Sequence, residues 1–266
     1  MSNVPELQRP WLIAVWPGMG HVAVSAGYYL MSKLGMHQFA ELSTEGIFDI
    51  DHVEVEAGIL HSAKLPRNRF FVWDDPDEKR DIVVFIGEAQ PPQGKYDFCR
   101  RLVEYAQQLG VERVMTFAAM ATNMHPSRQP QVLCAATDQE ILDELISHQM
   151  VTLESGNISG LNGILLGAAA DAGLRGCVLL GEMPHVFAQF PYPRAALVVL
   201  EAFTRLAAIE LDVIELRQQA DAVDARLGEL LERFEQSLEG AEPSEPEAYA
   251  TAGDEERLSP ADITRI

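Results

Sequence analysis

The feature that most constrains this chain is the alternation of short apolar runs with longer amphipathic stretches over its first 205 residues. The apolar runs predict buried strands near residues 11–16, 38–42, 69–73, 81–87, 113–118, 132–136 and 176–181. The amphipathic stretches predict helices near 21–34, 95–109, 138–148, 160–173 and 194–207. Strands that alternate with helices are typical of an α/β domain built on a mainly parallel or mixed sheet. We therefore expect an α/β core domain over residues 1–205.

Residues 45–61, "EGIFDIDHVEVEAGILH", differ from their surroundings because apolar and polar residues alternate without a helical period. Such alternation is typical of a strand with one exposed face. We expect this segment to form an antiparallel or edge piece of the main sheet.

From residue 206 the pattern changes to a heptad seam, in which the spacing between apolar residues alternates between three and four. Its members are Leu206, Ile209, Val213, Leu216, Ala220, Val223, Leu227, Leu230 and Phe234. The seam predicts a C-terminal helix over residues 206–238. The helix either lies along its own domain or pairs with a partner helix, and both arrangements bury the seam.

The charge balance argues against one large class of function. The chain carries 40 acidic and 20 basic residues, a formal net charge of -20, whereas nucleic-acid-binding proteins concentrate Lys and Arg. Residues 239–266 hold eight acidic and two basic residues and few large apolar ones. Such a segment cannot bury enough surface to offset its chain entropy, so we expect an acidic disordered tail without a specific function.

The cysteines and the hydropathy pattern indicate a cytoplasmic protein. Cys99, Cys134 and Cys177 stand singly without a C-x-x-C pair, so neither a disulfide framework nor a structural zinc site is indicated. The start "MSNVPELQRP" lacks a secretory signal pattern, and no apolar stretch is long enough to span a membrane. We expect reduced thiols, no membrane contact and a cytoplasmic location.

The stretch "WPGMGHVA" lies between a predicted strand and a predicted helix. Gly18, Gly20 and Ala23 match the spacing G-x-G-x-x-G/A of a dinucleotide-binding loop, and Glu41 stands where the ribose-binding acid would be. Against this reading, the proline before Gly18 has no amide to offer a phosphate. The alternative is a tight corner in which the glycines permit a sharp turn and close packing of helix on strand.

The stretch "GEAQPP" at residues 87–92 follows an apolar strand. Glu88 and Gln90 therefore lie where open α/β sheets place ligand sites, and Glu88 is a candidate general base. The alternative is a loop whose carboxylate caps nearby amides.

The stretch "ESGNISGLNGILLGAAADAG" at residues 154–173 leads through glycines into an apolar helix. Amides at the N-terminus of this helix suit an anion, but capping of the helix by Asn157 or Ser159 is the favoured alternative. The histidines have no second metal ligand at helical spacing, and neither H-E-x-x-H nor G-x-S-x-G occurs. We expect no metal site and no cofactor.

Four stretches taken together resemble the proteasome assembly chaperone 2 family in its prokaryotic branch, over roughly residues 11–220. They are "WLIAVWPGMGHVAVSAGYYLMSKLGMHQFAEL", "VVFIGEAQPP", "GNISGLNGILLGAAADAGLRGCVLLGEMPHVF" and "YPRAALVVLEAF", in family order. The family motif positions are Gly18, Gly20, Glu88, Gln90, Pro91, Gly156, Gly160, Gly163, Gly181 and Glu182. The resemblance implies a three-layer α/β/α sandwich similar to the phosphorylase/hydrolase-like fold. It also implies an oligomer-forming, chaperone-like role with no established reaction.

The chain departs from the family pattern at two places. His21 and Ala23 stand where relatives commonly have Asn and Gly, which puts a polar role at the turn in doubt. Some relatives that dock on the proteasome end in a hydrophobic residue, Tyr and any residue, whereas this chain ends in residues 264–266, "TRI". A proteasome partner is therefore not assured.

Two functions of different classes follow. The first is a non-enzymatic assembly or interaction protein that binds a protein partner and forms a homo-oligomer, with a trimer favoured. The second is a nucleoside or glycoside hydrolase or phosphorylase that uses Glu88 and Glu182 as paired carboxylates and the 156–163 loop for phosphate. The candidates for a ligand-binding cleft are Gly18, Gly20, His21, Gln90, Gly156, Asn157, Gly160 and Asn162.

Overall fold

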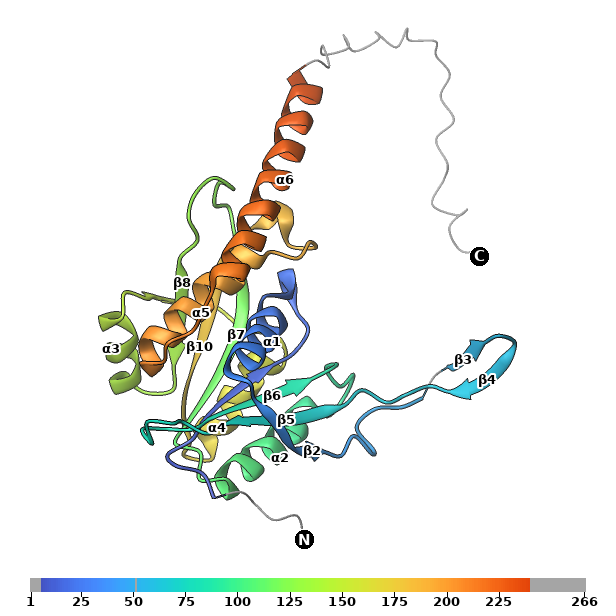
Figure 1. Ribbon diagram of the computed structural model, residues 1–266, viewed down its shortest axis with the longest axis vertical. Helices are drawn as coiled ribbons and strands as arrows, with labels where there is room; N and C mark the ends of the chain where they lie inside the picture. Colours follow the sequence, from blue (N-terminus) through green and yellow to red (C-terminus); the bar gives the residue numbers. More distant parts are fainter. Residues whose placement is uncertain (1–5, 51, 240–266) are drawn as a thin grey trace, which may run out of the picture. The chain divides into compact units, whose positions relative to one another are not determined.

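The computed structural model describes residues 6–50 and 52–239. The chain divides into two compact units, residues 1–228 and 229–266. The first unit holds the described strands and helices α1 to α5. Helix α6 spans Ile214–Glu239, so its residues up to 228 belong to the first unit and its later residues to the second. Figure 1 shows a central sheet with helices on both faces, which confirms the predicted α/β class.

Within the described residues, eight strands form one mixed sheet in the order β2–β5–β6–β1–β7–β10–β8–β9. Their bounds are β1 (Trp11–Val15), β2 (His37–Leu42), β5 (Asn68–Trp73), β6 (Ile82–Gly87), β7 (Arg113–Thr122), β8 (Val132–Ala136), β9 (Val151–Thr152) and β10 (Arg175–Pro184). The four central strands β6, β1, β7 and β10 run parallel, whereas β5 and β8 pair antiparallel with β6 and β10. The predicted strands are present, and β9 is an addition to them.

Helices on both faces of the sheet make the three layers. They are α1 (Val22–Leu34), α2 (Lys95–Gln108), α3 (Gln139–Ser147), α4 (Gly160–Asp171) and α5 (Pro193–Ala207), with 3-10 turns η1 (Met19–His21) and η2 (His185–Phe187). Strand β1 is buried on both sides: Ile13 belongs to the core that α1 and α5 cover, and Leu12 to the core that α2 and α4 cover. A strand buried on both faces needs a continuous apolar run, which is what "WLIAV" supplies.

The predicted C-terminal helix is interrupted. Helix α5 ends at Ala207, the C-cap residue Ala208 adopts a left-handed conformation (φ 55°), and residues 208–213 connect α5 to α6. Along α6, Leu216, Ala220 and Leu227 are buried in the same core as α1 and α5. As far as Leu227, the heptad seam therefore lies along its own domain.

Ion pairs hold the first part of α6 against α5. The buried Arg194 of α5 donates to Asp224 (Nε–Oδ2 2.7 Å) and also contacts Asp221, both on α6. Further along, Leu230 is 57% exposed. The side chain of Phe234 and the predicted acidic tail beyond Glu239 lie outside the described residues.

Residues 45–61 do not extend the main sheet, so this prediction was wrong. β3 (Val53–Glu56) and β4 (Ile59–Ser62) pair with each other as a separate antiparallel hairpin, which lies apart from the eight-stranded sheet (Figure 1). Every residue of both strands is exposed. The register puts Val53, Val55 and Leu60 on one face and the two β3 glutamates on the other. The hairpin thus has an exposed apolar face.

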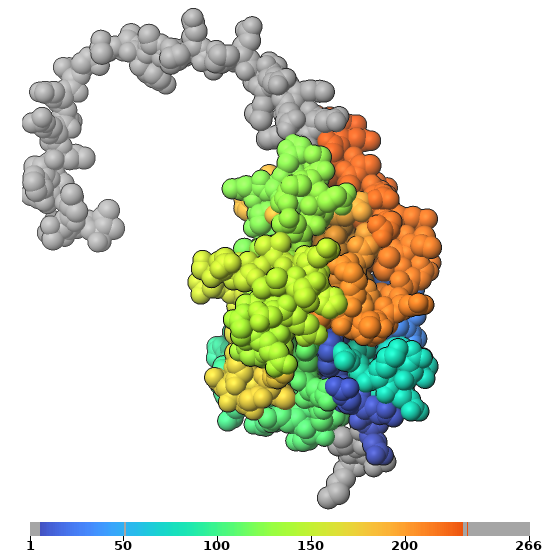
Figure 2. Space-filling view, turned by 90° about the vertical axis from the view of Figure 1, so that its left-hand side faces the viewer, coloured from blue at the N-terminus to red at the C-terminus, as the bar shows by residue number. Residues whose placement is uncertain are grey.

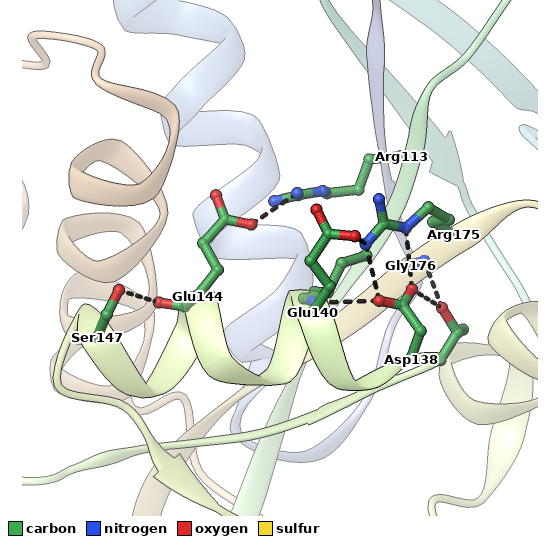
Figure 3. A network of polar contacts seen from close by, with 9 residues as sticks. Arg113, Asp138, Glu140, Glu144, Ser147, Arg175 and Gly176 are labelled. Atoms are coloured by element: carbon green, nitrogen blue, oxygen red, sulfur yellow. Dashed lines mark hydrogen bonds and ion pairs between the residues drawn. The ribbon is translucent and has the colours of Figure 1, made fainter.

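A polar network fastens α3 to the sheet (Figure 3). Asp138 caps the helix by accepting from the Ile141 amide (3.0 Å), and Arg175 of β10 donates to both Asp138 carboxylate oxygens (2.8 and 3.0 Å). Arg113 of β7 donates to Glu144 of α3 at 2.7 Å. In the space-filling view, the yellow-green α3 region borders the orange residues of α5 and the first part of α6 (Figure 2).

Candidate functional site

Three stretches that are far apart in the sequence meet at one cavity of about 470 Å³. It lies where the parallel strands β1, β6 and β7 end, which is where open α/β sheets place ligand sites. The structure places six of the predicted cleft residues around it: Gly18, Gln90, Gly156, Asn157, Gly160 and Asn162. Binding of a ligand there remains a prediction.

The turn after β1 is a packed corner at its inner residues. The Gly20 amide donates to the Ala188 carbonyl (3.3 Å), and the Gly20 carbonyl accepts from the Tyr192 amide (2.9 Å). Gly20 has φ 60°, and a Cβ on it would lie 2.9 Å from the sulfur of Met183, so another residue there would strain the backbone and displace the Met183 side chain. His21 also has a positive φ (53°) and is exposed. Unlike Gly18, neither residue lines the cavity.

Gln90 connects two walls of the cavity. Its Nε2 donates to the Pro17 carbonyl (3.2 Å), and its Oε1 accepts from the Leu161 amide in the first turn of α4 (3.2 Å). Gly160 has φ 73°, and a Cβ on it would lie 2.9 Å from the Gln90 Oε1, so another residue there would strain the backbone and displace the Gln90 amide. The amide of Gln90 therefore links the turn after β1 to the start of α4.

The start of α4 differs from the predicted capping. Ser159 precedes the helix but makes no capping hydrogen bond through its side chain, and Gln90 occupies the Leu161 amide instead. Asn162, in the same turn, is 8% exposed and lines the cavity. Its Oδ1 has no hydrogen-bond partner among the described residues. A buried acceptor of this kind is costly unless a donor reaches it.

Strand β7 contributes a wall of the cavity that no predicted site residue marks. Ala118, Ala119, Met120 and Ala121 all line the cavity, and Met19 and Ile158 lie on its other sides. The stretch "FAAMAT" carries no polar motif, so motif reading passed over it. The feature of the sequence that indicates this wall is the position of its small residues. They lie at the carboxyl end of a central strand, where they leave room for a ligand.

The two candidate catalytic carboxylates do not line this cavity, and both are engaged elsewhere. Glu88 accepts from Arg69 (2.7 Å) and from the Arg67 amide (2.9 Å) beside the β5–β6 pair. Glu182 is 6% exposed and accepts from Arg128 (2.5 Å) and Thr122 (2.8 Å), which fastens the segment between β7 and β8. This placement does not favour the hydrolase or phosphorylase alternative.

Glu41 does not lie where a ribose-binding acid of a dinucleotide site would lie. Glu41 lies on the edge strand β2, which β5 and β6 separate from β1, and it pairs with Arg67 at 2.5 Å. In a dinucleotide-binding fold the acid lies on the strand next to the glycine loop. The turn after β1 therefore has the glycine spacing of a dinucleotide-binding loop but lacks the acidic residue on the neighbouring strand.

The described residues contain no group of three or more His, Cys, Asp or Glu side chains that could hold a metal ion. The three cysteines are buried and unpaired. Burial raises the pKa of Cys99 to about 12, of Cys134 to about 11 and of Cys177 to about 12, so these thiols stay protonated near neutral pH. None of the described helices combines the length and apolarity that a membrane span requires.

The fold and the cavity define a three-layer α/β protein with a central mixed sheet and a cavity at the carboxyl ends of its parallel strands. The sequence model of the PAC2 family matches residues 12–231, and the chain belongs to that family. MJ1210 of Methanocaldococcus jannaschii is 25% identical over 249 residues, which cover 92% of each chain.

Solved structures of the same fold come from Pyrococcus furiosus. PbaB, an archaeal proteasome activator, is 26% identical and superposes with a TM-score of 0.73, covering 86% of this chain and 96% of PbaB. PbaA, an archaeal homologue of proteasome-assembly chaperone, is 26% identical with a TM-score of 0.67, covering 88% of this chain and 97% of PbaA. These likenesses confirm the predicted family and fold.

Proposed function

We propose that the protein is a chaperone-like assembly factor that acts in the cytoplasm as a homo-oligomer, with a trimer favoured, and binds a protein partner. Its membership in the PAC2 family and its likeness to PbaA and PbaB support a chaperone-like role. A 20S proteasome particle is one candidate partner, by analogy with those two proteins. The cavity, which the paired carboxylates do not line, supports a role other than hydrolysis.

The observation that carries the oligomer is the β3–β4 hairpin. Val53 is 57% exposed, Val55 66% and Leu60 69%, and the register places all three on one face. A two-stranded hairpin is marginally stable by itself, so a protein surface that covers this face stabilises it. We assign that surface to a second copy of the chain.

Size-exclusion chromatography with light scattering tests this proposal. We expect wild-type protein to elute as an oligomer at micromolar concentration, and the triple variant Val53→Ser, Val55→Ser, Leu60→Ser to elute as a smaller species with the same thermal stability of its core. Glu54→Gln on the opposite face is the matched control and should leave the mass unchanged. A monomeric wild-type protein contradicts the proposal.

A further inference from the structure

Strand β7 is longer than its neighbour β1, so its last residues have a strand on one side only. Residues 113–116 pair with β1, whereas residues 117–122 pair with β10 alone within the described part of the chain. In a parallel sheet, alternate residues direct their N–H and C=O groups to opposite neighbours. Every second residue of 117–122 therefore directs its N–H and C=O groups toward the side where β1 no longer pairs with β7.

The cavity lies against this open edge. Its lining includes four consecutive residues of β7, from Ala118 to Ala121. Because successive side chains of a strand point to opposite faces, a cavity that touches all four must reach the edge of the strand. Gly18, Gly156 and Gly160 line the same cavity and present backbone without side chains. Main chain therefore contributes to the lining at these three glycines as well as at the edge of β7.

The lining also limits the charge of a ligand. None of the described residues that line the cavity has an ionisable side chain, although the chain carries a net charge of -20. A charged group that entered would lose its hydration without gaining a counter-charge. The unpartnered Oδ1 of the buried Asn162 calls for a hydrogen-bond donor, and Met19 on the lining, 44% exposed, offers an apolar contact. The cavity suits a neutral ligand rich in amides.

From this geometry we propose that the cavity binds an extended, uncharged peptide segment of a protein partner, which pairs with the open edge of β7. Strand addition of this kind takes its affinity from main-chain hydrogen bonds, so it needs little specificity from the side chains. The main chain of a neutral peptide supplies partners for the N–H and C=O groups of the β7 edge. It also supplies a hydrogen-bond donor for the Oδ1 of Asn162. The inference rests on the proposed function in one respect, because it gives the chemical class of the protein partner.

The probe is N-acetyl-tri-alanine N-methylamide, titrated into the full chain and followed by calorimetry or amide chemical shifts. We expect saturable binding. The zwitterionic tri-alanine, which carries the same side chains with charged ends, should bind at least tenfold more weakly. An analogue with an ester in place of the central amide loses a main-chain donor and should bind several-fold more weakly.

Two variants localise the binding. Ala118 lies on the same face of β7 as Thr116, whose hydroxyl donates to the Asn162 carbonyl of α4, so Ala118→Leu should fill the cavity and abolish binding. Asn162→Leu removes the unpartnered acceptor and should weaken binding while the protein stays folded. Asn123→Leu, at an exposed position outside the lining, is the control and should bind as wild type does.

The proposal is overturned if the capped peptide shows no saturable binding at millimolar concentration, if the zwitterion binds as tightly, or if Ala118→Leu binds normally while circular dichroism shows it folded. Light scattering on the same samples separates the two proposals. Loss of peptide binding in an intact oligomer contradicts only the peptide site, and a monomer that binds the peptide contradicts only the oligomer.

Discussion

At the scale of single residues, short polar side chains act here as connectors between elements. Gln90 joins the turn after β1 to α4, Glu182 fastens the segment after β7, and Asp138 caps α3 while it accepts from Arg175. Glu182 and Gln90 also stand at family motif positions. At these two positions the side chain connects segments that are distant in the sequence.

Asp138 offers a test of one connection. The hydrogen bond from the Arg175 guanidinium holds the pKa of Asp138 well below its usual range, so folding favours the charged carboxylate. The resulting stability is present above the unfolded pKa of about 3.9 and is lost as the pH falls through the folded value. Because both side chains are partly exposed, we expect Asp138→Asn to cost about 1 kcal/mol or less at pH 7.

Urea unfolding of wild type and Asp138→Asn at pH 7 and below pH 4 measures this difference, which should shrink toward zero in acid. Asp138→Ala also removes the helix cap and should cost more, about 0.5–2 kcal/mol. Glu154→Gln, at an exposed position after β9, is the control. A pH-independent difference for Asp138→Asn would rule out the ion pair as its cause.

At the scale of elements, the C-terminal helix shows how burial decides what a heptad seam does. The first part of α6 packs on the core that α1 and α5 cover, and Arg194 ties it to α5. The seam residues that lie in this core are therefore part of the domain. Leu230, beyond them, is mostly exposed.

Leu216 and Leu230, two of the leucines of α6, give matched variants. Leu216 is 3% exposed, so Leu216→Ala should lower the free energy of unfolding by about 2–5 kcal/mol, through lost burial and the cavity left behind. Leu230→Ala, at a position 57% exposed, should change it by less than about 0.5 kcal/mol. Denaturant unfolding followed by circular dichroism measures both, and equal effects would contradict the packing described for α6.

At the scale of the whole molecule, the dominant property is negative charge. With 40 acidic and 20 basic residues, the folded chain carries a net charge of -20 and repels itself. The surface ion pairs described above are few against this excess. Self-repulsion should therefore set how stability responds to salt.

We expect the melting temperature near pH 7.5 to rise as salt is added. Going from about 0.01 M to about 0.1 M salt shortens the screening length from about 30 Å to about 10 Å, which weakens repulsion across the surface. Near the isoelectric point of 4.6 the net charge vanishes, and the same addition should have little effect or lower the melting temperature. Differential scanning fluorimetry checks both, and a fall at pH 7.5 would show that attractive pairs dominate.

The sequence by itself determined the elements and the family. Continuous apolar runs such as "WLIAV" are required by burial on both faces of a strand, so the strands, the helices and the α/β class could be predicted from local patterns. The order of the motifs along the chain identified the PAC2 family, and one motif glycine, Gly20, has a local cause in its positive φ.

Only the tertiary structure decided which of these corners meet. The cavity lies where β7 continues past the end of β1. The sequence of either strand does not reveal how its length compares with that of its neighbour in the sheet. The carboxylates of Glu88 and Glu182 looked alike in sequence, yet their ion pairs depend on partners brought near by sheet register. Local sequence sets conformation, whereas contacts between distant segments set the chemistry of the site.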